Sequence, residues 1–468
     1  MSKWEAGLSF EMSNLGGPMK RRYSSWLMFS GLALLAAGPA VSQISPMGVP
    51  APPPSANQPR TKAPIQPAPL PPGTGAPGAT QPVQQAAPAP PPLPPAIWDV
   101  PAALELGTYI NSLSAEGLNP ADYDAPGLMS AIQSGNIALI SQAATQRFNA
   151  VSTDLALGHV RKPARTAWFL VDKDLDDQKQ DALMRAAIAQ HNVTATLNGL
   201  LPTHPQYAAL KNALSVTPAS DTAKRNRIRL NLDRWRWLPR DLGQRYIIVN
   251  VPGFHATLVE NGVNRWKQRA IAGSLKTPTP QLSAMAVGVM LNPWWEVPPS
   301  ITKEVAGKPG YVALKDPKTG KLIRWRQPPG PRNALGQIKF VMYNTHNIYL
   351  HDTTAKTLFD TKARAYSHGC IRTEHILTLA EKLLAEGGTG EWTPEKIKAT
   401  VASKKTVQAN FPKPIPVYIV YMSSAALQGG EIKNYEDIYK RDGRVIAALN
   451  SGPALTPPAK PADKVASR

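Results

Sequence analysis

The residues of this chain with the clearest capacity for chemistry are its one cysteine and the histidines near it. Cys370 lies in the run 367–372, which reads Ser-His-Gly-Cys-Ile-Arg, and His351 precedes it in the run 349–353, Tyr-Leu-His-Asp-Thr. A thiol attacks a carbonyl carbon as the thiolate, and a histidine within hydrogen-bond reach is the usual means of forming it. The pattern therefore predicts a nucleophilic cysteine whose base is His351 or the nearer His368.

Neighbouring residues have roles of their own in this chemistry. Gly369 lacks a Cβ, so a substrate carbonyl oxygen can approach the main-chain N–H groups of residues 369–370, as an oxyanion hole requires. Arg372 is placed either to hold a substrate carboxylate through a two-point contact or to fix the loop in an internal ion pair. If residues 347–351 form a strand, Tyr349 and His351 share a face, and Tyr349 is a wall or a phenolic donor beside the thiol.

Two other interpretations of the cysteine are weaker. Free cysteines are often buried as small hydrophobes, but Cys370 is flanked by glycine and histidine rather than by an aliphatic run. A zinc site could combine Cys370 with four histidines, but the spacing fits no zinc pattern. We therefore expect no metal and no other cofactor. The four histidines are His346, His351, His368 and His375.

The elements that must position these residues change character near residue 240. Between about 98 and 238, apolar residues recur at three- and four-residue spacing, which predicts a helical scaffold. From residue 246 onward, apolar runs predict strands, with a hairpin turn at Asn261-Gly262. The predicted fold class is α+β, a mostly β catalytic domain packed against an N-terminal helical one. Helices are predicted at 102–113, 137–157, 177–189, 207–214, 375–385 and 393–402, and strands at 246–251, 255–259, 266–272, 285–291, 340–343, 347–351 and 416–422.

The N-terminal residues predict export. A basic segment at 19–22 precedes an apolar stretch at 26–37 that is short for a membrane span, and a small-residue cleavage signal follows at 40–42. We expect a signal peptide over residues 1–42, with Met19 an equally good start codon. The protein is then expected in the periplasm, and it contacts the membrane only if this segment stays uncleaved as an anchor.

Charge and composition limit the partners. The net charge is +20, and the excess of basic over acidic residues is spread over the folded part. The densest basic stretch, from Lys224 to Arg245, also has an apolar face, which predicts a solvated basic face beside a packed one. Since export separates the chain from nucleic acid, we expect no nucleic-acid partner, and the carboxylates of cell-wall peptides fit the charge instead. Nothing in the sequence predicts an oligomeric state.

The runs around His351 and Cys370 resemble the L,D-transpeptidase catalytic domain, also called the YkuD domain. Its signature is a histidine followed by Ser/Thr-x-Gly-Cys-x-Arg/Asn. Further segments resemble the large, YcbB-like branch of this family, so that the resemblance covers about residues 98–450. They are 117–123, 233–239 (Asp-Arg-Trp-Arg-Trp-Leu-Pro), 292–301 (Asn-Pro-Trp-Trp-Glu-Val-Pro-Pro-Ser-Ile), 328–336 (Pro-Pro-Gly-Pro-Arg-Asn-Ala-Leu-Gly) and 437–442.

The resemblance implies a reaction on peptidoglycan stem peptides, as donor and as acceptor. Cys370 attacks the carbonyl of the third residue of the donor stem, meso-diaminopimelate in most Gram-negative walls, and a thioester forms as D-Ala leaves. His351 is then the base, and the main-chain carbonyl of Asp352 orients its ring. Transfer of the acyl group to an amine makes a cross-link, and transfer to water is a carboxypeptidase reaction. The resemblance also implies that Gly369 and His368 support the oxyanion, and that Arg372, Tyr349, Ser367 and Trp295 bind substrate.

Two departures from the YcbB-like branch bear on the acceptor. Residues 214–222 leave room only for a loop where that branch commonly inserts a peptidoglycan-binding module, and the cap around 303–333 is short. This architecture favours 1→3 cross-links, from the L-Ala amine to meso-diaminopimelate, over 3→3 cross-links. The alternatives are an L,D-carboxypeptidase, a zinc peptidase and a wall-binding protein.

The chain is thus expected to have six parts. They are a signal peptide (1–42), a Pro-rich disordered linker (43–97), a helical scaffold domain (98–240), a catalytic domain (241–425), a C-terminal segment that returns to the scaffold (426–450) and a disordered tail (451–468).

Overall fold

The structure, a computed structural model, describes residues 94–171, 174–386, 390–427 and 431–452. The predicted signal peptide, the predicted linker up to residue 93 and the predicted tail from residue 453 lie outside the described residues. Residues 89–468 belong to one unit of the chain. Within the described part, no helix is long and apolar enough to cross a membrane.

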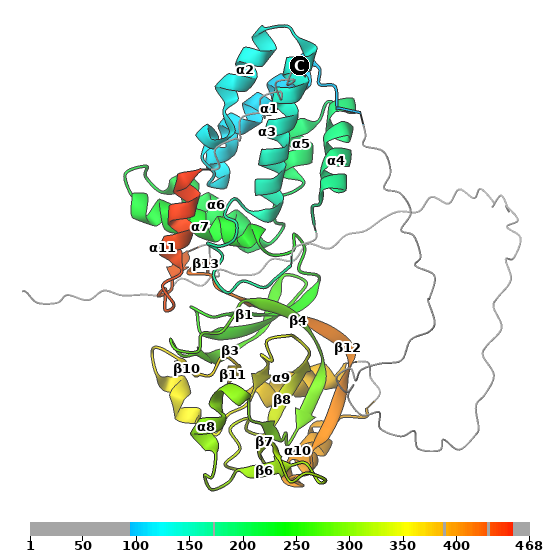
Figure 1. The fold of residues 1–468 in the computed structure, drawn as a ribbon, viewed down its shortest axis with the longest axis vertical. Coiled ribbons are helices and arrows are strands. Elements are labelled where there is room, and N and C mark those ends of the chain that lie inside the picture. Colours follow the sequence, from blue (N-terminus) through cyan, green and yellow to red (C-terminus); the bar gives the residue numbers. More distant parts are fainter. Residues whose placement is uncertain (1–93, 172–173, 387–389, 428–430, 453–468) are drawn as a thin grey trace, which may run out of the picture. The chain divides into compact units, whose positions relative to one another are not determined.

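The first part of this unit is helical, as predicted (Figure 1). The predicted helices 137–157 and 177–189 have the observed bounds, and each begins at a side-chain cap: Asn136 accepts two main-chain N–H groups and Asp176 accepts one. Two short helices escaped the sequence pattern because they bury only one or two residues each. The helices are α1 (Val100–Ser112), α2 (Ala125–Gln133), α3 (Ile137–Leu157), α4 (Asp177–Ala189), α5 (Val193–Asn198), α6 (Pro205–Val216) and α7 (Thr222–Arg236).

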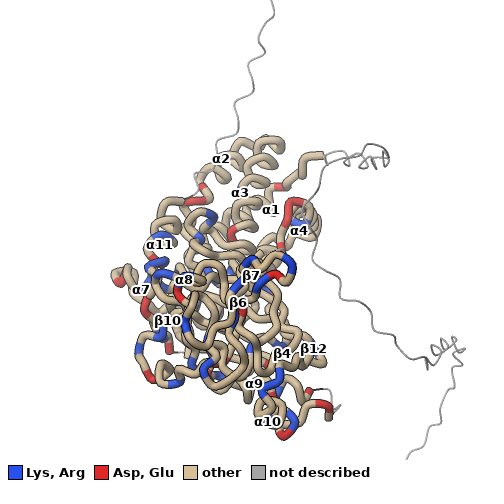
Figure 2. Tube along the Cα trace, turned by 60° about the horizontal axis from the view of Figure 1, so that its bottom comes forward, with Lys and Arg blue, Asp and Glu red and all other residues tan. Residues whose placement is uncertain are grey.

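Helix α7 contradicts the prediction of a solvated basic face. Arg234 and Arg236 are only 2% and 1% exposed. Arg234 pairs with Asp442 at 2.8 Å, and Arg236 donates to the Tyr207 hydroxyl at 2.7 Å. These two arginines are part of the core, where a buried cation persists only with fixed partners. Nor is the basic excess evenly spread: Figure 2 shows few Lys and Arg on α1–α3 and more around α7, β7 and α9.

The second part is built on a nine-stranded sheet in the order β10-β3-β11-β9-β8-β4-β12-β1-β2. Because β2 also pairs with β3, the sheet closes on itself as a barrel, and β10 is attached outside the ring. The predicted α+β fold is therefore confirmed. The strands are β1 (Arg245–Asn250), β2 (His255–Glu260), β3 (Val263–Gly273), β4 (Leu282–Leu291), β8 (Ile338–Met342), β9 (Leu350–His351), β10 (Ala365–Ser367), β11 (Ile371–Thr373) and β12 (Val407–Val420).

The predicted hairpin turn is confirmed. Asn261 and Gly262 both have positive φ, at 50° and 75°, and β2 and β3 pair on either side of them. The predicted strand 347–351 is wrong in length, because only Leu350–His351 is extended in the sheet. Asn347 has φ of 53°, a left-handed conformation that breaks a strand.

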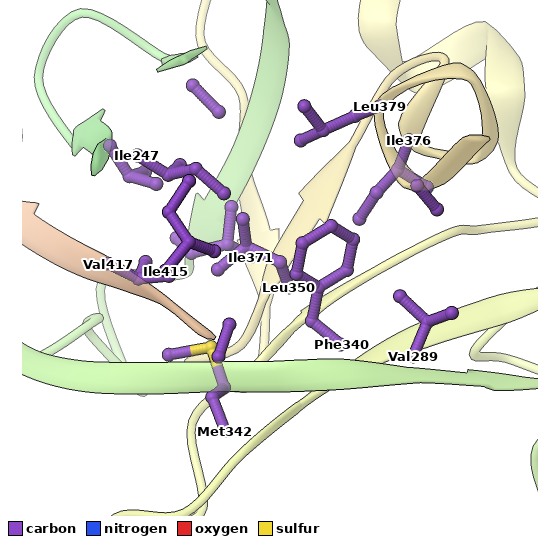
Figure 3. Packing of buried hydrophobic residues seen from close by; sticks show 14 of the residues in the cluster. Ile247, Val289, Phe340, Met342, Leu350, Ile371, Ile376, Leu379, Ile415 and Val417 are labelled. Carbon is purple, nitrogen blue, oxygen red and sulfur yellow. The ribbon is translucent and has the colours of Figure 1, made fainter. Parts of the chain in front are cut away.

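The barrel core fixes the backbone on both sides of the reactive residues. Leu350, next to His351, and Ile371, next to Cys370, are both fully buried. They pack with Phe340 of β8 and with Ile376 of α9 (Ile376–Ala385) in one apolar cluster (Figure 3). A further helix, α10 (Pro394–Ala402), contributes the buried Ile397.

A separate small sheet forms a cap. Its strands β5 (Trp295–Glu296), β7 (Leu322–Gln327) and β6 (Val312–Lys315) pair in that order, and the short helix α8 (Thr302–Val305) lies between β5 and β6 in the chain. The cap has its own apolar cluster of Val297, Ile301 and Val305, against which Trp295 packs. It starts about eight residues before the predicted cap around 303–333.

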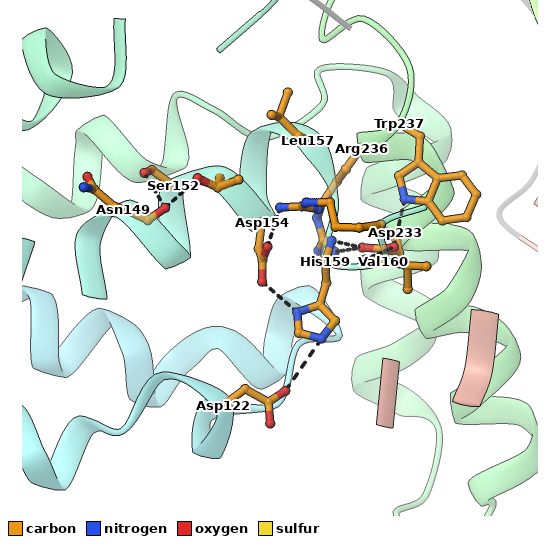
Figure 4. A network of polar contacts seen from close by, with 12 residues as sticks. Asp122, Asn149, Ser152, Asp154, Leu157, His159, Val160, Asp233, Arg236 and Trp237 are labelled. Atoms are coloured by element: carbon orange, nitrogen blue, oxygen red, sulfur yellow. Dashed lines mark hydrogen bonds and ion pairs between the residues drawn. The ribbon is translucent and has the colours of Figure 1, made fainter. Parts of the chain in front are cut away.

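A buried polar network ties the helical part to the connection that leaves α3 (Figure 4). The Asp233 carboxylate of α7 accepts the main-chain N–H groups of His159 at 2.7 Å and Val160 at 3.1 Å, and the Trp237 indole N–H at 2.8 Å. His159 Nδ1 lies 2.6 Å from Asp154. These contacts satisfy buried polar groups and fix the course of the chain just after α3.

The chain returns to the helical part at its C-terminal end. The strands β13 (Ser424–Ala426) and β14 (Ile432–Asn434) pair, and α11 (Asp442–Ser451) follows. Asp442 of α11 holds Arg234, and Asn450 accepts from Arg229 at 2.8 Å. Both arginines belong to α7, so these contacts fasten α11 to α7.

Candidate active site

Cys370 lies in the short loop between β10 and β11. Both strands pair with β3, β10 in parallel and β11 antiparallel, and β11 also pairs in parallel with β9, which carries His351. Residues Arg372 and His351 are direct partners in that register. The sheet therefore brings the cysteine loop and the predicted base together, although β9, β10 and β11 have only two or three residues each.

Side chains close to Cys370 hold the loop in place. The Ser367 hydroxyl donates to the Cys370 carbonyl at 2.5 Å and accepts from the Gly369 N–H at 3.1 Å. Thr277 Oγ1 donates to the Ser367 carbonyl at 3.0 Å, and Thr279 Oγ1 donates to the Gly369 carbonyl at 2.8 Å. Ser367, predicted as a substrate contact, thus uses its hydroxyl inside the loop, while Thr277 and Thr279 carried no recognisable sequence signal.

The loop needs glycine at position 369. Gly369 has φ of 113°, and a Cβ there would lie 3.2 Å from Ile348 Cδ1. The Gly369 N–H is directed to Ser367 Oγ rather than into the cavity. Of the two N–H groups predicted to form the oxyanion hole, one therefore remains as a candidate donor. That donor is the Cys370 N–H, for which no described residue is an acceptor.

His351 is buried and held by a single main-chain contact. Its Nδ1 lies 2.5 Å from the carbonyl oxygen of Asp352, the predicted orienter, so Nδ1 carries the proton and Nε2 has the free lone pair. Burial and, to a smaller extent, the Arg372 charge lower the pKa of His351 to about 3. The imidazole is therefore neutral at physiological pH.

Asp352 is itself fixed by the turn before β8. Its carboxylate accepts the Gln337 N–H at 3.0 Å and pairs with Lys356. Gly336, with φ of 63°, lies so close that a Cβ there would be 2.3 Å from the carboxylate. The turn thus holds the Asp352 backbone, and with it the carbonyl that orients His351.

The thiol of Cys370 is partly covered and uncharged. Burial raises the pKa of Cys370 to about 11, against hydrogen bonds from the Tyr349 main chain and side chain and the charges of Lys339 and Arg372, which lower it. The Sγ atom also lies 3.6 Å from the Asn347 carbonyl oxygen. Among the described contacts there is no hydrogen bond between Cys370 and His351. The groups at the sulfur are Tyr349, as a phenolic donor, and the Asn347 carbonyl.

Two cations, Lys339 and Arg372, face this thiol, and Glu296 acts electrostatically on Lys339. Neither Lys339 nor Arg372 has an ion-pair partner among the described residues, and Arg372 Nε is buried without a hydrogen bond. Burial lowers the pKa of each cation, and the charge of Cys370 as thiolate raises it. The Lys339 ammonium lies 5.0 Å from the Tyr349 ring centroid. The internal ion pair considered for Arg372 is not formed, and Lys339 is a site residue that the sequence did not reveal.

A cavity of about 890 Å³ opens between this cluster and the cap. Cys370, His351, Arg372 and Tyr349 line it from the barrel, and Trp295 lines it from β5. His368 also lines it, but its Nε2 contacts Glu304 of α8 at 3.3 Å, and among the described residues no hydrogen bond joins it to Cys370. His368 therefore links the loop to the cap. The remaining lining residues include His346, Asn347 and Lys339.

The histidines considered for zinc do not converge. Among the described residues, no three His, Cys, Asp or Glu side chains are grouped as a metal would require. His375 lines a different cavity, beside Arg269 and Lys267, and His351 Nδ1 is committed to Asp352. The geometry offers a thiol, an imidazole and two cations rather than a metal-ligand set.

Two family models match the chain. Residues 244–416 match the L,D-transpeptidase catalytic domain (YkuD), and residues 95–214 match a Scaffold domain. A Haemophilus influenzae protein, provisionally named an L,D-transpeptidase, is 32% identical over 233 residues, which are 44% of this chain and 46% of that protein. The chain thus spans about half the length of this curated relative.

Solved structures of the same kind are also similar to part of the chain. An L,D-transpeptidase from Mycobacterium smegmatis is 13% identical and covers 38% of this chain and 58% of its own, with a TM-score of 0.20. L,D-transpeptidase 1 from Mycobacterium tuberculosis is 14% identical and covers 38% of this chain and 61% of its own, with a TM-score of 0.18.

Proposed function

Because residues 244–416 match the L,D-transpeptidase catalytic domain, we propose that the protein cross-links peptidoglycan stem peptides through a thioester on Cys370. The observation that carries the proposal is the cavity in which Cys370, neutral His351 and unpaired Arg372 meet. A thiol, a base and a free guanidinium are what acyl transfer from a carboxylate-bearing peptide requires.

The geometry supports a definite course for the first step. The Cys370 proton passes to His351 Nε2, the lone pair left free by the contact of Nδ1 with Asp352. The sulfur attacks the carbonyl carbon, and the charge that develops on the oxygen is met by the Cys370 N–H. The C–N bond then breaks, and His351 returns the proton to the departing D-Ala amine.

The substrate is held by charge on one side and by the cap on the other. Arg372 is the residue best placed to bind a stem-peptide carboxylate, since it lines the cavity without an acidic partner. Trp295 and Tyr349 bound the cavity as aromatic walls. Lys339, which is half-buried, adds positive charge to the same region.

For the second step we propose 1→3 cross-links, from an L-Ala amine to diaminopimelate, with 3→3 as the alternative. Helix α6 ends at Val216 and α7 begins at Thr222, so no peptidoglycan-binding module interrupts the described helices at this point. Acceptor selection then depends on the catalytic part itself. We further propose that the protein acts in the periplasm, on the basis of its N-terminal sequence.

The test is to incubate the protein with a purified tetrapeptide muropeptide and to analyse products by mass spectrometry. We expect a covalent dimer whose fragments identify the linkage, and no product from Cys370→Ala. A tripeptide alone would mean an L,D-carboxypeptidase. Product formation that resists a thiol alkylator but stops with a chelator would mean a zinc peptidase, and the absence of any product would favour a wall-binding protein.

The roles of the two histidines near the thiol can be separated in the same assay. We expect His351→Ala to lower the acylation rate by about 10² or more, because it removes the general base. His368→Ala should lower it much less, since the 3.3 Å contact of His368 is with Glu304 of the cap. The opposite ranking would transfer the role of base to His368.

A further inference from the structure

We propose that the helical part contributes the acceptor-side wall of the active site, through Phe169. This inference rests on the proposed function and concerns its second step, in which the acceptor amine attacks the thioester carbonyl, a C–N bond forms, the C–S bond breaks, and the amine proton returns through His351 to the sulfur. The residue that selects the acceptor would then come from outside the catalytic domain matched at 244–416.

The connection after α3 reaches the catalytic part as an added strand segment. Trp168 forms a parallel bridge with Gln281, the Phe169 N–H donates to the Gln281 carbonyl at 2.8 Å, and the Gln281 N–H donates to the Ala167 carbonyl at 2.9 Å. Gln281 lies two residues after Thr279, which holds the Gly369 carbonyl. The segment 167–169 is therefore anchored directly beside the support of the cysteine loop.

From this anchor Phe169 reaches the rim of the active-site cavity. Its ring centroid lies 4.0 Å from that of His346, with 39° between the planes. His346 lines the cavity, and its neighbour Asn347 places its carbonyl 3.6 Å from Cys370 Sγ. Phe169 thus contacts His346, a residue of the cavity wall. His346 directly precedes Asn347, whose carbonyl lies near the sulfur.

The loop that carries His346 is rigid enough to form a wall. Asn344 Oδ1 accepts the N–H groups of His346 at 3.2 Å and Ile348 at 3.1 Å, and Asn344 Nδ2 donates to the Ile348 carbonyl at 2.7 Å. One side chain therefore satisfies most of the loop's polar groups. Phe169 is not needed to close the loop, because these bonds already do so.

The exposure of Phe169 favours a binding role over a packing role. It is 48% exposed, and among the described residues the only aromatic ring that it contacts is that of His346. A phenylalanine that only stabilised the fold would bury most of its ring, since the gain scales with the apolar area removed from water. The remaining face is available to the apolar part of a ligand.

The position of Phe169 favours a role toward the acceptor rather than the donor. After D-Ala leaves, the acyl group stays attached to Cys370 in the cavity under the cap, where Glu304 and His368 close one side. Phe169 lies against His346 at the edge of the cavity and is not one of the residues that line it. An incoming amine on this side meets an aromatic face, which fits an amine flanked by a small apolar side chain such as that of alanine.

The experiment compares Phe169→Ala and Phe169→Leu with wild type in two separate steps. Acylation is followed as the mass increase with a carbapenem and with a tetrapeptide donor, and acceptor use is followed as the dependence of dimer formation on acceptor concentration. In Phe169→Ala we expect unchanged acylation and an acceptor KM raised about three- to tenfold. The reason is that the variant lacks the exposed part of the ring, which the acceptor would cover. Phe169→Leu should restore part of the affinity.

Val263→Ala is the matched control, because Val263 is also 48% exposed but lies in the β2–β3 hairpin. An equal loss in acylation and acceptor use would overturn the proposal and leave Phe169 a structural support for His346. An unchanged acceptor KM would overturn it too. If wild type itself were not acylated, the proposed function would fail instead. The acylation measurement detects this outcome independently of acceptor use.

Discussion

The protonation state of Cys370 makes a prediction that separates this site from a preformed ion pair. Burial raises the pKa of the thiol from 9.0 to about 11, and burial lowers the pKa of His351 to about 3. Between these values the free enzyme holds a neutral thiol beside a neutral imidazole. We predict that alkylation of Cys370 by iodoacetamide has no plateau at neutral pH.

The magnitude follows from the thiolate fraction. A pKa near 11 leaves about one thiolate in ten thousand at pH 7, and a pKa of 9.0 leaves about one in a hundred. Since the thiolate is the nucleophile, alkylation at pH 7 should be about a hundredfold slower than for an unperturbed thiol of equal access. The rate should rise about tenfold for each pH unit until the fold or the reagent limits it.

The assay is pseudo-first-order alkylation followed by intact-protein mass, which the chain's 1 cysteine makes unambiguous. Tyr349→Phe removes a phenolic donor that lowers the pKa, and Lys339→Met removes a charge that does the same, so both should slow alkylation at any fixed pH below the pKa. Tyr366→Phe, on the neighbouring β10, is the control. A plateau with an apparent pKa below about 7 would refute the reasoning, because it would require a thiolate paired with protonated His351.

Two predictions concern the elements that support the site. Asp442→Ala should lower the free energy of unfolding by about 3–5 kcal/mol in a urea titration, because it leaves buried Arg234 without its carboxylate. The control is Asp360→Ala, which removes an exposed ion pair with Arg269. A loss of stability in Asp442→Ala no larger than in this control would contradict the prediction. Gly369→Ala should reduce carbapenem acylation at least tenfold, because φ of 113° and Ile348 at 3.2 Å oppose a Cβ, whereas Gly443→Ala meets no neighbour and should acylate normally. Equal acylation of both glycine variants would show that the loop tolerates a side chain.

The sequence located the reacting residues better than the elements that carry them. Cys370 and His351 do face one cavity, but β9, β10 and β11 are too short to show any periodicity. Their pairing is determined by long-range partners in β3 and β8, which no local pattern encodes. The five-residue strand expected to end at His351 fails at Asn347, whose left-handed φ is set by the turn that Asn344 closes.

The surroundings of charged side chains are the feature that the sequence predicts least well, because a sequence does not reveal burial. Arg234 and Arg236 occupy the basic run that predicts a solvated face, yet both lie in the core with fixed partners. Lys339 looks like an ordinary strand lysine, and only the register of β8 against β9, which pairs it with His351, brings it beside the thiol. Thr279 is fully buried and holds the loop that carries Cys370, but a threonine between two prolines carries no such signal in the sequence.

The two unpaired cations explain how a site with so few thiolates could still be reactive. Lys339 and Arg372 stand near a thiol and an imidazole that are both neutral, so positive charge faces the thiol, although Glu296 offsets part of the charge of Lys339. In the proposed reaction, a donor carboxylate would neutralise part of this charge on binding, and the negative charge that develops on sulfur and then on the carbonyl oxygen would neutralise more. Because a buried charge without a partner is costly, the same cations that are unfavourable in the empty site favour the bound substrate and the transition state. In this proposal Cys370 becomes reactive when the substrate binds. Slow, pH-dependent alkylation of the free protein is compatible with this, because alkylation measures the thiol in the absence of substrate.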